Sequence, residues 1–347
     1  MPQVSVIIPN YNHAPYLRQR FDSIFNQTYQ NFEVIILDDC STDNSKKIIE
    51  EYRNRPQVSH IIYNEINSGS PFKQWAKGFD LARGEYIWIA ESDDWAELNF
   101  LKHLVFILNK DPSLVFAFCE SYWEYPEKTI PGRTFKKDSI YKGTDFIRNK
   151  QIYNNNIVNA SSVLFRKQAL FNIAIDYQFF KGSGDYLFWS SLCEHGNIYF
   201  TKNILNHFRR PPINTTSQCM ATGKTFIENF NIYIYFKKKG YISRFANYRI
   251  IEHALSEIEK LKNDLQKNRC YSNCKDIWEK ERKSQKLNST FLFFWANQIN
   301  RCENLPFYAK IWQFLHLPNT NIRKFFSIER KSIKHDSAAN FHNNSHL

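Results

Sequence analysis

The chain has 347 residues, of which 43% are hydrophobic and 16% aromatic, and a net charge of +12. This composition excludes a disordered polymer, and the length suggests two units. No apolar run reaches the ~18 residues of a membrane span, the start lacks a signal-peptide pattern, and seven scattered cysteines suit a reducing compartment. We therefore expect a cytoplasmic protein, soluble or peripheral to a membrane.

The first 120 residues alternate buried strands with amphipathic helices. Short apolar, β-branched runs predict strands at Val4–Ile8, Phe32–Leu37, Val58–Tyr63, Tyr86–Ala90 and Leu114–Cys119. Apolar residues at helical spacing predict helices between these strands, the last of them over Asn99–Asn109. The alternation is typical of an α/β protein with a mostly parallel sheet.

The pattern changes after residue 120. Residues 120–160 are polar and rich in turn formers, and strands are predicted at Ser161–Arg166 and Asn197–Phe200, with a helix between them. A mobile loop is expected over 209–216, and a basic, helical pattern begins near Thr225. These features predict an α/β domain at 1–218, a basic aromatic-rich helical extension at 219–335 and a disordered tail at 336–347.

Acidic pairs follow two of the predicted strands. Asp38 and Asp39 come after the second strand, and Asp93 and Asp94 come after the fourth. The carboxyl ends of strands form the ligand-binding edge of such a sheet, and clustered carboxylates there favour a hard divalent ion. Taken singly, either pair could be helix caps; taken together, they favour a site.

Several segments resemble family 2 glycosyltransferases, which are inverting enzymes of the GT-A fold that use nucleotide-diphospho-sugars. The resemblance is carried by Val4–Asn12, Ser23–Thr28, Glu33–Asp43 and Ala82–Asp94, the last ending in a DxD-type metal motif. It covers roughly residues 3–217. The fold that this resemblance implies is an α/β, Rossmann-like GT-A domain, here followed by the helical extension.

The resemblance implies roles for residues at the nucleotide site. Asp39 would accept a hydrogen bond from the base, as a uracil N3–H requires. Pro9 and Tyr11 would line the base pocket, and Tyr11 could stack on the ring. The expected donor is therefore a nucleotide-diphospho-sugar, and among these donors a UDP-sugar is favoured.

The resemblance also implies a site for Mn²⁺ or Mg²⁺. Asp94 would be the main metal ligand, and Asp93 would lie near the ribose or the ion. Glu91 stands where the family motif has its first aspartate, so its contact with the metal stays open. Arg209 or Arg210, in the loop that follows, could close over the phosphates or remain solvated.

A general base is the last requirement of inverting transfer. Gly184–Trp189 resembles the family segment in which an acidic residue before an aromatic helix is the base, which makes Asp185 the candidate. The alternative is that Asp185 only caps the helix it opens.

The extension carries most of the charge. Residues 219–347 have 22 basic against 11 acidic residues, whereas residues 1–218 have 24 against 23. The lysines at 237–239 and the segments Phe291–Trp295 and Trp312–Leu317 mix cations with aromatics, which favours docking on an anionic membrane. We expect this region to dock the enzyme rather than build the active site; the alternative is a helical packing appendage.

The resulting hypothesis is an inverting hexosyl- or N-acetylhexosaminyl-transferase. Its acceptor would be a saccharide or a lipid-linked sugar in cell-surface polysaccharide or glycolipid synthesis. The enzyme would be cytoplasmic and peripheral to the inner face of the cell membrane. The alternative is a catalytically silent nucleotide-binding protein with a basic region for a membrane or polyanion. The sequence has no nucleic-acid-binding motif, so nucleic acid is not an expected partner.

Overall fold

The computed structural model describes residues 1–132, 134–173, 175–211 and 214–284. The strands are β1 (Val4–Asn10), β2 (Phe32–Asp38), β3 (Val58–Tyr63), β4 (Tyr86–Ile89), β5 (Trp95–Ala96), β6 (Leu114–Tyr125), β7 (Lys128–Pro131), β8 (Ser139–Lys142), β9 (Val163–Arg166) and β10 (Asn197–Arg209). The helices are α1 (Ala14–Phe25), α2 (Ser45–Glu51), α3 (Pro71–Leu81), α4 (Phe100–Lys110), α5 (Gly143–Phe146), α6 (Gly184–Cys193), α7 (Thr215–Ala221), α8 (Lys224–Lys238), α9 (Arg244–Lys260), α10 (Lys262–Lys267) and α11 (Tyr271–Ser284).

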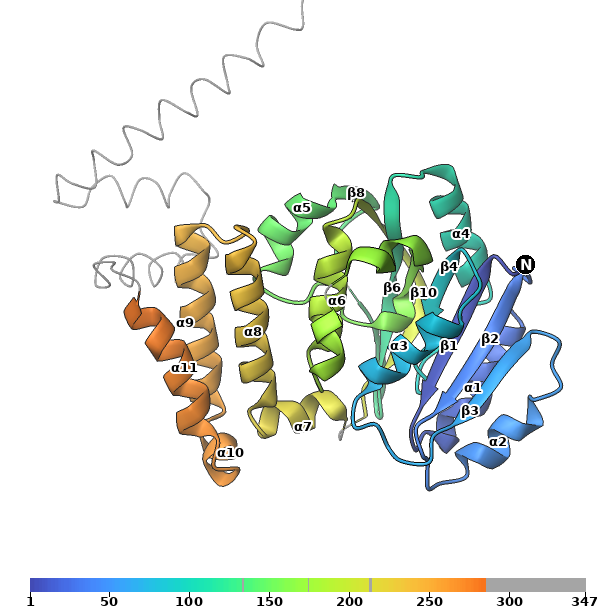
Figure 1. The fold of residues 1–347 in the computed structure, drawn as a ribbon, viewed down its shortest axis with the longest axis horizontal. Coiled ribbons are helices and arrows are strands. Elements are labelled where there is room, and N and C mark those ends of the chain that lie inside the picture. The colour runs from blue at the N-terminus through green and yellow to red at the C-terminus, as the bar shows by residue number, and fades with distance from the viewer. Residues whose placement is uncertain (133, 174, 212–213, 285–347) are drawn as a thin grey trace, which may run out of the picture. The chain divides into compact units, whose positions relative to one another are not determined.

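The strands form a single sheet in the order β3-β2-β1-β4-β9-β6-β10-β5, with β7 added to β6 and β8 to β10. The first four strands are parallel, and every residue of β1 and β2 is buried. Alternate side chains of these strands enter two hydrophobic cores. Helices α1, α2 and α4 cover one face of the sheet, and α3 and α6 cover the other (Figure 1). The predicted α/β architecture of this half is confirmed.

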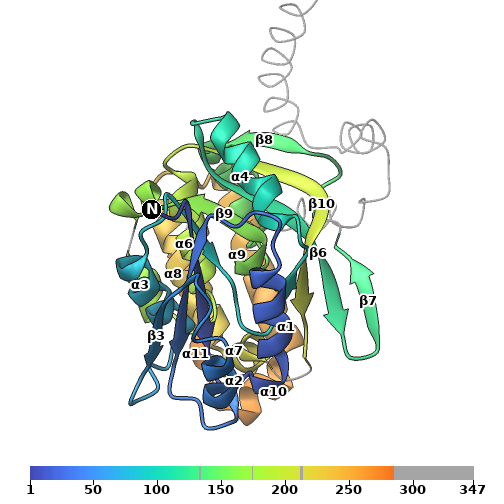
Figure 2. The same ribbon diagram turned by 90° about the vertical axis from the view of Figure 1, so that its right-hand side faces the viewer.

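The second half of the sheet differs from the sequence prediction. Strand β6 runs to Tyr125 rather than Cys119, and β10 runs to Arg209 rather than Phe200. The added parts pair with each other through bulges, and the hairpin of β6 and β7 is seen in Figure 2. These parts are polar, so they lack the apolar alternation that marks a strand in sequence. The region 120–160, expected as turns, contains β7 and β8.

The helices after β10 have a hydrophobic core of their own. Phe226 of α8, Ile251 and Ile258 of α9 and Trp278 of α11 are buried together. Residue 218, the predicted domain boundary, lies inside α7. None of the helices in the described part of the chain combines the length and the hydropathy that a membrane crossing requires. The expected tail at 336–347 lies outside the described residues.

Candidate active site

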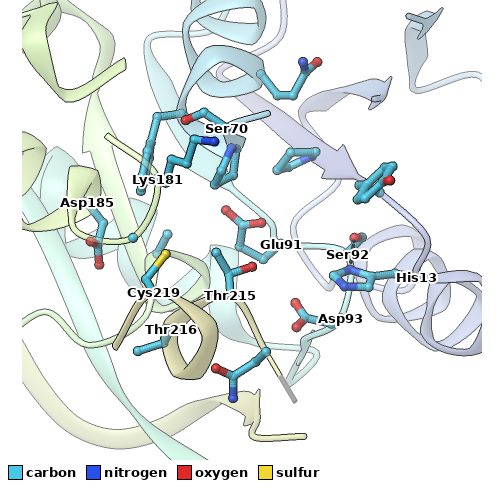
Figure 3. A pocket seen from close by; sticks show the side chains of 18 of the residues that line it. His13, Ser70, Glu91, Ser92, Asp93, Lys181, Asp185, Thr215, Thr216 and Cys219 are labelled. Carbon is cyan, nitrogen blue, oxygen red and sulfur yellow. Dashed lines mark hydrogen bonds between the residues drawn. The ribbon is translucent and has the colours of Figure 1, made fainter. Parts of the chain in front are cut away.

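A cavity of about 550 Å³ opens at the carboxyl ends of β1, β2 and β4 (Figure 3). Its lining comes from segments that are far apart in the chain. It includes Pro9, Tyr11, Asp39, Asp93, Asp94 and Asp185, to which the sequence assigned roles, but not Asp38 of the first acidic pair.

The turns after β1 and β2 are tied to each other. The Asp38 carboxylate accepts hydrogen bonds from Asn10 Nδ2 (2.7 Å) and from the Ser41 hydroxyl (2.6 Å). Asn12 and Cys40 both have positive φ, +56° and +64°, in these two turns. Such backbone is uncommon outside glycine, so we attribute it to this hydrogen-bond network. Asp38 is therefore a structural residue, and the network fixes the turn that presents Tyr11, whose side chain is 47% exposed.

The Asp39 carboxylate is buried and already well bonded. Its Oδ1 accepts from Asn64 Nδ2 (2.6 Å), Gln74 Nε2 (2.9 Å) and the backbone N–H of Ser68 (2.9 Å). Within the part of the chain that the structure describes, its Oδ2 accepts from Ser68 alone, through the hydroxyl at 2.7 Å and the N–H at 3.1 Å. Asp39 thus holds the 64–69 loop on β2, and Oδ2 has the spare acceptor capacity.

A tight turn after β4 carries the acidic cluster. Asp94 N–H donates to the Glu91 carbonyl at 3.2 Å, which folds residues 91–94 back on themselves. Asp94 Oδ2 accepts from Asn159 Nδ2 (2.9 Å) and Ser161 Oγ (2.7 Å), and Oδ1 accepts from the backbone N–H of Arg209 (3.1 Å). Asp94 is 1% exposed, so these bonds fix its orientation.

Burial makes this cluster costly to ionise. It raises the pKa of Glu91 to about 8 and, helped by the charge of Asp93, that of Asp94 to about 7. Burial also raises the pKa of Asp93. A divalent cation bound among these three carboxyl groups would stabilise their ionised forms, which burial and mutual repulsion disfavour.

The residues present fit such an ion. Glu91 and Asp93 point into the cavity (Figure 3), and among the described residues Asp94 Oδ1 accepts one hydrogen bond, from Arg209 N–H. Glu91 Oε1 accepts from Trp75 Nε1 at 2.8 Å, which leaves Oε2 for a ligand. Within the described ranges, no three His, Cys, Asp or Glu side chains already converge on one point as metal ligands. Hard ions of this kind commonly complete their shell with water and phosphate oxygens.

Arg20 lies fully buried behind the acidic turn, and the sequence analysis did not identify it. Its Nε donates to the Glu91 carbonyl (2.9 Å) and its Nη2 to Ser161 Oγ (2.8 Å). Burial lowers the pKa of Arg20 to about 10, opposed by the nearby carboxylates. The available signal was its position, since Arg20 falls on the apolar face of α1 that Leu17 and Ile24 define.

The two arginines of the loop after β10 take different positions. The Arg209 guanidinium donates to the Asp93 carbonyl and to Gln19, and its Nε lies 3.6 Å from Glu124. It therefore anchors the acidic turn. Arg210 also lines the cavity, and its guanidinium lies over aromatic rings. No ion pair of Arg210 occurs among the described residues, so its charge is available to a phosphate.

Asp185 is not the cap of α6. Ser183 holds the N-cap position, and Asp185 lies in the first turn with its Oδ2 accepting from Asn155 Nδ2 at 2.9 Å. Burial raises the pKa of Asp185 to about 7. Gly184 permits this placement, because a Cβ there would lie 2.5 Å from the Phe72 ring. A buried carboxyl that ionises near neutrality suits a general base.

The turn before Asp185 is held by a residue of α8. The Glu228 carboxylate accepts three backbone hydrogen bonds, from Lys181 (2.7 Å), Gly182 (2.9 Å) and Ser183 (2.7 Å). The same part of the chain lines the cavity through Cys219, Thr222 and Lys224. The expectation that residues beyond 218 take no part in building the site is therefore wrong.

The aromatic and basic residues of α8 are largely engaged within the protein. Tyr233 and Phe236 are buried, and Lys237 and Lys239 pair with Glu281 (2.5 Å) and Glu194 (2.7 Å). The aromatic segments at 291–295 and 312–317 lie outside the described residues. For the described part, helix packing accounts for the aromatic pattern.

Residues 5–173 match the family model described as glycosyl transferase family 2. Over 118 residues the chain is 36% identical to the putative teichuronic acid biosynthesis glycosyltransferase TuaG of Bacillus subtilis, covering 34% of this chain and 46% of TuaG. The chain thus spans less than half the length of this curated relative.

Two solved structures share the fold. Residues 1–349 of Staphylococcus aureus TarS in complex with UDP-GlcNAc match with a TM-score of 0.54 at 18% identity, over 83% of this chain and 95% of that one. The mannosyltransferase PcManGT of Pyrobaculum calidifontis, in complex with GDP-Man and Mn²⁺, matches with a TM-score of 0.50 at 15% identity, over 90% and 83%. The expected GT-A fold is confirmed, and the matched segment, residues 5–173, belongs to glycosyl transferase family 2.

Proposed function

We propose that the protein is an inverting glycosyltransferase that moves a sugar from a nucleotide-diphospho-sugar to an acceptor hydroxyl. The observation that carries this proposal is the single cavity that gathers Asp39, the 91–94 turn and Asp185 from three distant segments. Such a transfer needs three parts: a site for the nucleobase, a site for the diphosphate and a group that accepts the proton of the acceptor hydroxyl.

The donor is proposed to be a UDP-sugar carrying a hexose or an N-acetylhexosamine. Tyr11, exposed at the rim, would stack on the uracil, and Pro9 would line its pocket. Asp39 Oδ2 would accept from the uracil N3–H, since Oδ1 is occupied by three protein donors. The UDP-GlcNAc bound to TarS, a protein of the same fold, supports this donor class.

The diphosphate is proposed to be neutralised from both sides. Asp93 and Asp94, with Glu91 beside them, would hold Mn²⁺ or Mg²⁺, which when bound stabilises negative charge on the leaving diphosphate. Arg210, with no ion pair among the described residues, would contact a phosphate oxygen. Arg20 would offset the charge of the acidic turn from behind.

Asp185 is proposed to take the proton of the acceptor hydroxyl. As that oxygen forms its bond to the anomeric carbon, the bond from this carbon to the diphosphate breaks and its electron pair leaves with the nucleotide. Attack from the side opposite the leaving group inverts the anomeric configuration. The raised pKa of Asp185 makes the carboxylate a stronger base than an exposed aspartate.

The cellular role that we propose is synthesis of a cell-surface polysaccharide or glycolipid. The relative TuaG is named for teichuronic acid biosynthesis, which supports this class of product. The acceptor would be a saccharide or a lipid-linked sugar, and the enzyme would work in the cytoplasm, peripheral to the inner face of the membrane.

The proposal is tested by thermal shift and turnover. UDP with Mn²⁺ should raise the melting temperature, because a ligand that occupies only the folded state stabilises it. A panel of nucleotide-sugars should then identify one that releases its nucleotide in the presence of protein and Mn²⁺. No shift with any nucleoside diphosphate, together with no turnover of any donor, would refute the proposal.

A further inference from the structure

A second cavity, of about 330 Å³, adjoins the first one at Asp185. The two cavities share six lining residues, which form a neck between them: Val158, Gly182, Asp185, Phe208, Arg210 and Thr216. The acidic turn and the Tyr11 turn line only the first cavity. The second cavity is therefore a separate compartment on the far side of the proposed base.

Asp185 has a hydrogen-bond partner in this compartment. Asn155, which donates to Asp185 Oδ2 at 2.9 Å, lines the second cavity and not the first. In an inverting transfer the base lies between the donor sugar and the acceptor hydroxyl. The side of Asp185 that faces away from the acidic turn is thus where an acceptor would approach.

The outer wall of the second cavity is built by the helices after β10. Its lining includes Asn229, Tyr233 and Phe236 of α8, His253, Ala254 and Glu257 of α9, and Trp278 of α11. The three aromatic rings are buried, at 1–3% exposed, and form the apolar part of the wall, while the amide, imidazole and carboxylate groups beside them can bond the hydroxyls of a pyranose.

Two polar side chains of this wall have hydrogen-bonding capacity to spare. Within the described part of the chain, no hydrogen bond is formed by the side chains of Asn229 and His253, which face the cavity from α8 and α9. The cavity also has an apolar component, since Ile152, Ile232 and Ile250 line it. A sugar ring with an apolar aglycone matches both parts.

We propose that this second cavity is the acceptor site and that it binds a hexopyranoside with an apolar aglycone. The inference rests on the proposed function, because it assigns the acceptor of that same reaction. One ring hydroxyl points through the neck to Asp185, which takes its proton as the new glycosidic bond forms. The helical extension thereby sets acceptor specificity, and the GT-A half sets donor specificity.

The test uses octyl β-glucoside, octyl β-galactoside and octyl β-N-acetylglucosaminide, each below its micelle concentration. Binding to the full chain is followed by saturation-transfer NMR without any nucleotide. At least one glycoside should receive saturation at its ring protons. No saturation on any of the three would overturn the proposal.

Variants locate the bound glycoside. Ala254→Trp should abolish the saturation signal by filling the cavity, whereas Ser256→Trp, an exposed position of the same helix outside the cavity lining, should keep it. Should Ala254→Trp fail to fold, the double variant Asn229→Ala/His253→Ala tests the same point, because loss of two hydrogen bonds should weaken binding at least about fivefold. Binding that is indifferent to these variants would place the glycoside elsewhere and overturn the proposal.

A separate measurement distinguishes this inference from the proposed function. UDP affinity with Mn²⁺ is read by calorimetry on the same proteins, with no glycoside present. One outcome would refute the acceptor site alone. In that outcome the protein binds nucleotide and turns over the donor, but glycoside binding is the same in Ala254→Trp as in the wild type. The opposite outcome would refute the transferase proposal instead. In that outcome Ala254→Trp loses glycoside binding, but neither the wild type nor any variant binds nucleotide.

Discussion

Replacement of Glu228 is expected to damage catalysis from a helix outside the family-matched segment. Its carboxylate accepts hydrogen bonds of 2.7–2.9 Å from three backbone N–H groups in the turn before Asp185. Glu228 itself is 9% exposed. Hydrogen bonds to a charged group contribute roughly 1.5–3 kcal/mol each, and such contributions are not additive. Since water can enter the space that a shorter side chain leaves, we expect Glu228→Ala to cost about 3–5 kcal/mol of folding free energy.

The gradation between substitutions is as informative as the loss. In Glu228→Gln the amide oxygen can replace Oε2, which bonds Gly182 and Ser183, while the amide nitrogen cannot accept from Lys181. The glutamine variant should thus lose about 1–2 kcal/mol, less than alanine. Glu279→Ala is a matched control, because its ion pairs among the described residues, with Arg282 and Lys283 of the same helix, are long, at 3.6 and 3.8 Å. Such pairs contribute about 0–1 kcal/mol.

Three assays on these variants check the reasoning. In urea denaturation the free energy of unfolding should be lowest for Glu228→Ala, intermediate for Glu228→Gln and highest for Glu279→Ala. Turnover should fall in the same order while UDP affinity stays unchanged, because the base turn and the nucleotide site lie on different segments. The Glu228 charge also raises the pKa of Asp185, as a smaller effect after burial. The acid limb of the rate profile should accordingly move to lower pH in the alanine variant. A Glu228→Ala protein with wild-type stability and turnover would refute this account.

The other predictions concern the cavity itself and the extension. Asp185→Asn should retain UDP and Mn²⁺ binding and lose about 10²–10⁴ in kcat, and a fully active variant would exclude Asp185 as the general base. Turnover of the wild type should fall as the pH drops through about 7, because the Asp185 carboxylate is then protonated. Asp94→Ala should abolish turnover, and full activity in EDTA would count against the metal. Asp39→Ala should lower UDP affinity by at least about 0.5–1.5 kcal/mol in calorimetry, and an unchanged affinity would remove Asp39 from the base pocket. Full-length protein should sediment with anionic vesicles and be released by salt; equal binding to neutral vesicles would contradict membrane docking by charge.

The parallel half of the fold was predictable because its strands are buried on both faces. Val6–Ile8 and Val34–Leu37 are short apolar runs rich in β-branched residues and followed by polar turns, which is typical of a buried strand. Strands β7 and β8 lie at the edge of the sheet with largely exposed residues, so their sequences carry no such signal. The polar ends of β6 and β10 were missed for the same reason.

The site was predictable where motif and chemistry coincide, and less so where packing decides. The acidic pairs and Asp185 follow strand ends or open a helix, so their approximate place could be read from the sequence. Glu228 could not be found this way, because its role depends on how α8 packs beside α6. Nothing in the local sequence of Glu228 distinguishes it from a surface glutamate.

The Glu228 contact also has a consequence for synthesis of the chain. Ser183 precedes its partner by 45 residues, and at about 5–20 residues per second a ribosome takes roughly 2–9 s to add them. Throughout that interval the parallel strands can pair, but the backbone donors before Asp185 have no carboxylate to bind. During synthesis the strands β1–β4 are therefore complete before Glu228 can fix the turn that carries the proposed base.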